Sequence, residues 1–225
     1  MPTLAAFGED QRRAIEAAVD AAEQKSAAEI VVSIAERSGR YDRAEDIFGF
    51  LIGLVAVSVA WLIWQRVEPD TSDWVPGYAV SMGLVAVLII LALWTVLGAA
   101  VASAVPALSR AFVGRREMSE EVRRRGIEAY HLMRVGTTPE AHGILIYVSL
   151  FEHMVWVSGD DAVNAKLGEK AFQGYGDQIA AGFRAGTPVD AIVQAVREIG
   201  DMLAPHFPLG AANPDQLPNT VRVMT

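Results

Sequence analysis

The sequence contains no cysteine, which excludes disulfide bonds, cysteine nucleophiles and thiolate metal sites. It also lacks a zinc signature, a glycine-rich phosphate loop and the short motifs that mark the nucleophiles of common hydrolases. These absences remove the enzyme classes that local motifs identify best. They favour a protein that has no catalytic residue and no organic cofactor.

Positive charge is scarce as well. The chain has 19 basic and 27 acidic residues, and its net charge of −8 argues against nucleic acid as a partner. Arginines prevail between Arg110 and Arg134, whereas acidic residues prevail from Gly136 onward. The first 24 residues include several acidic side chains and no long apolar run, so we expect no export signal there.

Apolar residues are abundant, at 52% of the chain, and the excess lies in its middle third. Asp46 and Arg66 bracket 19 uncharged positions. A helix over residues 47–65 would be about 28 Å long, close to the ~30 Å hydrocarbon thickness of a bilayer. The alternative is a helix buried inside a soluble protein, but a domain of this size is too small to enclose two helices that are apolar on every face.

The second apolar run is longer, because no charged residue occurs between Asp73 and Arg110. We expect a second span over residues 78–105. Pro69 and Pro76 lie in the connection, which we interpret as a tight loop. The pattern therefore predicts a two-helix transmembrane hairpin.

Arginines flank this hairpin on both sides, whereas the connection has Arg66 alone among acidic residues. Because positive charge stays inside, both termini should be cytoplasmic, as in a two-pass protein of the inner membrane. The arginines after the second span also form a candidate surface for anionic lipid head groups; the alternative is a topology signal on a solvated helix. They are Arg110, Arg115, Arg116, Arg123, Arg124 and Arg125.

Gly49 and Gly53 are four positions apart in the first span, a spacing that lets two helices approach closely. We expect this face to contact the second span of the same chain. The alternative is a seam between two copies of the chain, that is, a homo-oligomer.

The remaining residues predict an α/β domain with a small mixed sheet of three to four strands covered by helices, interrupted by the hairpin. The first and second strands are joined through a helix and should be parallel, whereas only four residues connect the second strand to the third, which should be antiparallel. Helices are expected over 7–25, 119–133, within 162–183 and from Thr187, and strands over 30–35, 144–149 and 154–158.

This pattern divides the chain into four parts. Residues 1–43 and 110–208 form the two halves of the α/β domain, and residues 44–109 form the hairpin. Residues 209–225 contain several prolines and asparagines, so we interpret them as a flexible tail.

Three segments resemble the TPM domain family, in a bacterial branch that carries a membrane hairpin after the first strand. They are AAVDAAEQKSAAEIVVSIAER from Ala17, HGILIYVSLFEHMVWVSG from His142, and the Phe-Arg-Ala-Gly step from Phe183. The resemblance implies the small mixed sheet and an association with membranes. It also implies divalent-cation binding and weak acid phosphatase activity, which have been attributed to some members of the family.

The chain departs from that family before the second strand. The common pattern there is Asp-Asn-Gly, whereas this chain has Ala141, His142 and Gly143. The Gly-Tyr-Gly-Leu-Glu stretch that follows the third strand in the family is also missing, since the chain continues with Asp160 and Asp161. These changes weaken the implied metal binding and phosphatase chemistry.

One cluster of polar residues is still expected at an end of the sheet. Parallel pairing of the first two strands brings Glu29 beside His142, and the third strand returns to Asp160 and Asp161. Such a set suits Ca²⁺ or Mg²⁺. The alternative, which we favour, is that both aspartates cap the next helix while His142 is solvated. Glu152, in the turn at the opposite end, is expected to be exposed.

Two functional hypotheses follow. The first is a membrane-anchored, non-catalytic module that binds other membrane proteins and assists their assembly or maintenance. Its partners would be the lipid bilayer and those proteins. The second is a weak phosphohydrolase that depends on a divalent cation at the end of the sheet.

Overall fold

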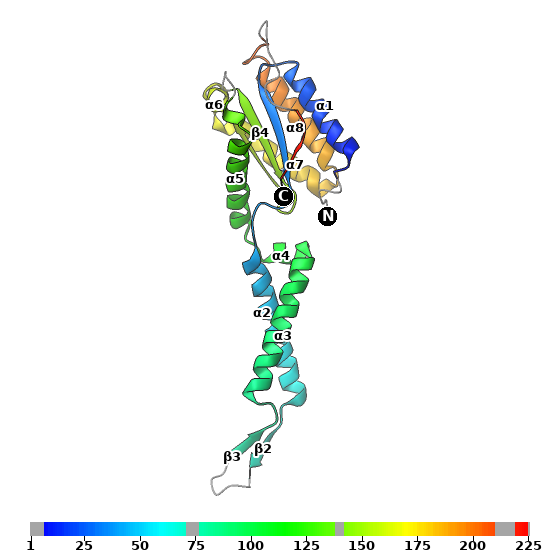
Figure 1. The fold of residues 1–225 in the computed structure, drawn as a ribbon, viewed down its shortest axis with the longest axis vertical. Coiled ribbons are helices and arrows are strands. Elements are labelled where there is room, and N and C mark those ends of the chain that lie inside the picture. Colours follow the sequence, from blue (N-terminus) through cyan, green and yellow to red (C-terminus); the bar gives the residue numbers. More distant parts are fainter. Residues whose placement is uncertain (1–6, 71–76, 138–141, 210–218, 225) are drawn as a thin grey trace. The chain divides into compact units, whose positions relative to one another are not determined.

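The computed structural model describes residues 7–70, 77–137, 142–209 and 219–224. The chain divides into two compact units, each described by itself below (Figure 1). One unit combines residues 1–39 with residues 115–225, and the other is the continuous segment 40–114.

The first unit contains a four-stranded mixed sheet with the order β5-β4-β1-β6. β1 (Glu29–Ala35) pairs in parallel with β4 (Gly143–Ser149), and β4 pairs antiparallel with β5 (Met154–Gly159). The α/β fold class and these strand directions are confirmed. In this antiparallel pair Ile144 lies opposite Gly159.

Every residue of β1 and β4 is buried, because helices cover both faces of the sheet (Figure 1). Side chains alternate between the faces. Ile30, Val32 and Ile34 belong to a large apolar cluster on one face, and Val31 and Ala35 to a smaller one on the other. The helices that contribute to the larger cluster are α1 (Glu9–Glu23), α6 (Asp161–Leu167), α7 (Gln173–Ala185) and α8 (Pro188–Leu203). The smaller cluster is covered by α5 (Arg115–Leu132).

The described residues of this unit also include two short 3₁₀ turns, η2 (Val135–Thr137) and η3 (Glu169–Phe172). The second falls between α6 and α7, so the segment over 162–183 is broken into separate helical pieces. Thr187 occupies the N-cap position of α8, but its side chain makes no capping hydrogen bond. The cap that the sequence suggested at Thr187 is therefore absent, while Pro188 does begin the helix.

The interpretation of residues 209–225 as a flexible tail was wrong for the last described residues. β6 (Arg222–Met224) pairs in parallel with β1 and extends the sheet. Hydrogen bonds from Asn219 Nδ2 to Asp20 (2.6 Å) and from the Val221 amide to Glu16 (3.0 Å) hold this segment beside α1. Residues 210–218, with the prolines that suggested the tail, lie outside the described residues.

The second unit is a helical hairpin of α2 (Asp42–Trp64) and α3 (Leu84–Ala104), followed by the short α4 (Pro106–Phe112). The two long helices pack against each other at small residues. A Cβ atom added to Gly49 would lie 2.4 Å from the backbone oxygen of Thr95, and one added to Gly53 would lie 2.9 Å from that of Leu91. Both glycines therefore face α3 of the same chain, and only hydrogen fits there.

Both helices are long and apolar enough to cross a membrane. At 23 and 21 residues they measure about 34 and 32 Å, against ~30 Å for the hydrocarbon layer. Their large side chains are mostly exposed, including Leu62 at 84% and Leu84 at 72%. A helix from the core of a soluble protein would bury such side chains, so this exposure fits contact with lipid.

The connection between the helices is a two-stranded ribbon and not the expected tight loop. β2 (Val67–Asp70) pairs antiparallel with β3 (Gly77–Val80), and residues 71–76 lie outside the described part. At the base of the ribbon Ser81 Oγ accepts from the Arg66 amide and donates to the Trp64 carbonyl, both at 2.7 Å. The second apolar helix consequently begins at Leu84, six residues after the expected position.

Candidate functional site

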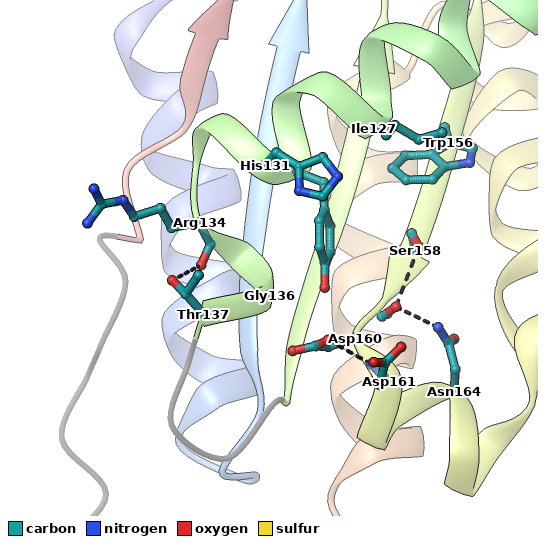
Figure 2. A pocket seen from close by; sticks show the side chains of 12 residues that line it. Ile127, His131, Arg134, Gly136, Thr137, Trp156, Ser158, Asp160, Asp161 and Asn164 are labelled. Carbon is teal, nitrogen blue, oxygen red and sulfur yellow. Dashed lines mark hydrogen bonds between the residues drawn. The ribbon is translucent and has the colours of Figure 1, made fainter.

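A pocket of about 460 Å³ lies at one end of the sheet, between α5, the end of β5 and the start of α6 (Figure 2). Its lining combines aromatic rings with hydroxyl, carboxylate and amide groups. The residues that line it are Ile127, Tyr130, His131, Arg134, Gly136, Thr137, Trp156, Ser158, Gly159, Asp160, Asp161 and Asn164.

Asp160 lies at the inner end of this pocket and is only 9% exposed. The Asp160 amide donates to the Gly143 carbonyl (2.8 Å), so β4 fixes the backbone. Its Oδ1 accepts from the Asp161 amide at 2.7 Å and caps α6, as the sequence suggested. Its Oδ2 is buried and has no hydrogen-bond partner among the described residues. Oδ1 of this carboxylate is thus committed to the cap of α6, and Oδ2 is enclosed by the protein.

Tyr130 of α5 supplies an aromatic wall beside this carboxylate. Burial raises the pKa of the Tyr130 hydroxyl well above its usual range. The negative charge of Asp160, a hydrogen bond with the Asp160 side chain and the charge of Asp161 raise this pKa further. The hydroxyl therefore keeps its proton at every physiological pH. Figure 2 shows that Arg134, although it lines the pocket, extends its guanidinium away from the two aspartates.

Trp156 of β5 forms another wall, and Gly126 of α5 makes room for it. A Cβ atom added to Gly126 would lie 2.5 Å from Cε3 of the indole and 2.9 Å from Cδ2. The ring therefore lies flat against the helix backbone, and the glycine decides how far it extends over the pocket.

Gly126→Ala should lower the stability of the α/β unit by about 1 kcal/mol, and by no more than about 2 kcal/mol. Overpacking a rigid ring costs ~1–3 kcal/mol, which exceeds the ~1 kcal/mol that alanine gains over glycine inside a helix. Thermal unfolding of the full-length protein in detergent measures the difference. Gly174→Ala in α7 is the matched control, because a Cβ atom there meets nothing within 4 Å. An unchanged or higher melting temperature for Gly126→Ala would contradict this packing.

The four predicted cation ligands are only partly brought together. The Glu29 amide donates to the His142 carbonyl (3.3 Å), so the strand ends meet as expected near Asp160. Among the described residues, however, no three histidine, aspartate or glutamate side chains are grouped so that they could hold a metal ion. His142 is also not simply solvated, since its ring packs on Phe207 with 4.4 Å between centroids. Ala141 lies outside the described residues.

Glu152 was expected to be exposed, and this expectation was wrong. The side chain is 1% exposed and accepts hydrogen bonds from the backbone amides of Ser38 (3.0 Å) and Gly39 (3.2 Å). Ser149 Oγ donates to its other oxygen. The carboxylate thus joins the turn after β4 to the segment that leaves β1 toward the hairpin.

This buried network extends into the sheet. Ser38 Oγ donates to Ser149 Oγ (2.7 Å) and lies 3.0 Å from the Tyr147 hydroxyl. Burial raises the pKa of Tyr147, the hydrogen bond with Ser38 opposes that shift, and the negative charge of Glu152 adds to it. Ser149 ends β4 opposite Ala35, the last residue of β1, and Ser38 follows β1 by three residues. These two serines were the sequence signal for the network.

Glutamates on the same helix offset part of the positive charge of the arginine cluster. On α5 Arg116 pairs with Glu120 (2.9 Å) and Arg125 with Glu128 (2.8 Å), while Arg124 pairs with Glu121 (2.5 Å). The sequence of α5 holds five arginines and four glutamates, so its net positive charge is small. Arg110 lies in the last turn of α4, and Arg115 and Arg123 are exposed.

Comparison with known proteins supports the fold and no more. No protein-family model matches the chain, and no curated protein matches it. The chain is similar to the NMR structure of the BA42 protein from the psychrophilic bacterium Bizionia argentinensis, with a TM-score of 0.55 and 17% sequence identity. The match covers 96% of this chain and 94% of that one, so the two proteins share a fold.

Proposed function

We propose that this chain is a two-pass protein of the inner membrane that resembles TPM domain proteins and binds other membrane proteins during their assembly or maintenance. The observation that carries the proposal is the exposed apolar surface of α2 and α3. In the sequence these helices interrupt an α/β unit whose apolar clusters are formed by the unit's own described residues. Such a hairpin serves to hold the α/β unit at a membrane. The unit then presents its pocket and helix faces to neighbouring proteins.

The flanking charges support an orientation with both termini in the cytoplasm. Arg40 and Arg43 precede the apolar part of α2, and Arg110, Arg115 and Arg116 follow α3. The ribbon between the helices carries Arg66 and the exposed Glu68. The α/β unit would therefore lie on the cytoplasmic side and the ribbon outside.

Cysteine labelling in intact cells tests this orientation, and the native chain is a blank because it has no cysteine. Glu68→Cys in the ribbon should react with an impermeant maleimide added from outside. Asp190→Cys, at an exposed position in the first turn of α8, should react only after the cells are opened. The reverse pattern would place the α/β unit outside and refute the proposed topology.

Crosslinking of the full-length protein, followed by purification in mild detergent, tests the binding role. Photoreactive residues at exposed positions of the α/β unit, such as Asp190 or Arg197, should capture the same few membrane proteins in repeated preparations. Residues placed on the ribbon serve as controls. Capture of nothing above background would contradict a binding module. Hydrolysis of a generic phosphomonoester that is lost in Asp160→Asn would support the weak phosphohydrolase instead.

A further inference from the structure

β5 forms one edge of the four-stranded sheet, because β4 is its only neighbour among the described strands. The Asp160 amide donates to the Gly143 carbonyl of β4 (2.8 Å), so the backbone groups of Asp160 point toward β4. Successive residues of a strand point their N–H and C=O groups to opposite sides. The amides and carbonyls of Val155, Val157 and Gly159 therefore point away from the sheet.

Both ends of this outer row of backbone groups are covered, and its centre is not. The Gly159 carbonyl accepts from Asn164 Nδ2 (2.7 Å; Figure 2). At the other end α7 comes close, since a Cβ atom added to Gly176 would lie 3.1 Å from the Val155 carbonyl oxygen. Val157 lies between these two ends, and among the described residues its outward amide and carbonyl have no hydrogen-bond partner. Such groups at the edge of a sheet can pair with another chain.

Two hollows of about 470 and 300 Å³ lie along this edge. They share Arg123, Val155, Trp156 and Gly176, so they form one groove, which we call the edge groove. Residues of α5 line one of its walls and residues of α7 the other. An edge recessed between two helices admits a single extended segment, whereas a second copy would bring its own α5 and α7 against these walls.

The two walls of the edge groove differ in chemistry. On the side of α7, Val155 and Val157 pack with Phe172 against the larger apolar cluster. On the side of α5, Arg123 is exposed and makes no ion pair with a described residue, whereas three other arginines of this helix pair with its glutamates. The exposed carboxylate of Asp177 on α7 disfavours a second acid on that side. An extended segment with apolar side chains on one face and an acid on the other complements both walls.

We propose that the edge groove binds an extended segment of a partner protein, which adds to the sheet as a further strand beside β5. The backbone of this segment pairs with Val157, its apolar side chains face α7, and an acidic side chain lies beside Arg123. This inference rests on the binding role proposed above and deepens it, because it states the chemistry of the segment that is bound.

A capped peptide, acetyl-TVTVEVT-amide, is the probe. Its valines share one face of an extended strand, and its glutamate lies on the other face. The indole N–H of Trp156, which lines the groove, reports binding to full-length protein labelled with nitrogen-15 in detergent. Single Trp→Phe replacements assign the five indole signals, and the other four tryptophans serve as internal references.

The peptide should shift the Trp156 signal with a dissociation constant on the order of 0.1 mM at physiological salt. Replacement of its glutamate by glutamine should weaken binding about three- to fivefold, and Arg123→Gln should have the same effect. The two changes together should weaken binding no more than either alone, because both remove one ion pair. Arg197→Gln, at an exposed position of α8, is the matched control and should leave binding unchanged.

Methylation of the peptide backbone tests strand addition and requires no change in the protein. Successive amides of an extended peptide point to opposite sides, so only alternate amides face β5. One peptide is N-methylated at its three valines, and another at its third and fifth residues. One of the two should bind at least about tenfold more weakly than the parent peptide, and the other within about twofold of it.

Three results would overturn the proposal. The first is equal binding of the two methylated peptides, and the second is equal binding of the glutamate and glutamine peptides to the native protein. The third is a Trp156 signal that shifts with protein concentration when no peptide is present, which would identify a second copy of the chain as the occupant.

The crosslinking experiment described above separates this inference from the role on which it rests. If photoreactive residues capture membrane proteins but the peptide does not bind, the binding role stands and the edge groove is not its site. If the peptide binds with the expected dependence on Arg123 but crosslinking captures nothing, the edge groove binds extended segments and the role toward membrane proteins fails.

Discussion

Replacing residues 44–109 with a short Gly/Ser linker is expected to yield a soluble, cooperatively folded α/β protein. Both apolar clusters of the sheet are built from residues outside the hairpin, on either side of it in the sequence. None of the described residues of the hairpin belongs to either cluster. Its removal should therefore leave the core intact while deleting the large exposed apolar side chains of α2 and α3.

Gel filtration without detergent, circular dichroism and thermal unfolding measure this outcome. The shortened protein should elute as a compact species and unfold in one transition. Leu145→Asp, which places a charge at a fully buried strand position, provides the negative control and should abolish that transition. Aggregation of the shortened protein, or unfolding without cooperativity, would show that the α/β unit needs the hairpin to fold.

The second large effect is expected at Glu152. Glu152→Ala removes the acceptor for the backbone amides of Ser38 and Gly39 and leaves both donors buried without it. Each unsatisfied buried group costs ~1–3 kcal/mol, so we expect a loss of about 3–5 kcal/mol. For a chain of this length that corresponds to a fall in melting temperature of roughly 6–20 °C.

Two further variants separate the hydrogen bonds from the charge. Glu152→Gln keeps one acceptor oxygen for the two amides and should cost only about 1–2 kcal/mol. Glu120→Ala breaks an exposed pair with Arg116 and should change stability by less than ~1 kcal/mol. Thermal unfolding of the full-length protein in detergent ranks the three. A Glu152→Ala protein as stable as Glu120→Ala would contradict the role of this carboxylate.

The sequence alone predicted β1, β4 and β5 of the four-stranded sheet, their directions and the apolar hairpin. These features have short-range causes. β1 and β4 are continuous apolar runs because both of their faces are covered, and the four residues between β4 and β5 permit only an antiparallel return. Charge-free stretches of 19 and 36 residues predicted α2 and α3, because about 20 apolar residues in a helix match the thickness of a bilayer.

The candidate site was predicted less completely. The sequence placed Asp160 at the cap of α6 and near the start of β4, which the structure confirms. The sequence did not predict that Tyr130 lines the pocket. Residues of α5 are charged along most of the helix, so the pattern does not single out this inward-facing side chain. The pocket exists because Gly126 lets the ring of Trp156 lie against that helix, a contact between residues 30 positions apart.

The elements that the sequence misplaced depend on partners distant in the chain. β6 contains three residues and becomes a strand only because the free edge of β1 offers hydrogen bonds. Glu152 lies in a turn, where a carboxylate is usually solvated. The backbone amides of Ser38 and Gly39, more than 110 positions away in the sequence, donate hydrogen bonds to it. Local pattern thus determined the strands and apolar helices of this protein, because those depend on each segment's own side chains. The tertiary structure decided which polar groups are buried, because that depends on the hydrogen-bond partners that the fold brings to them.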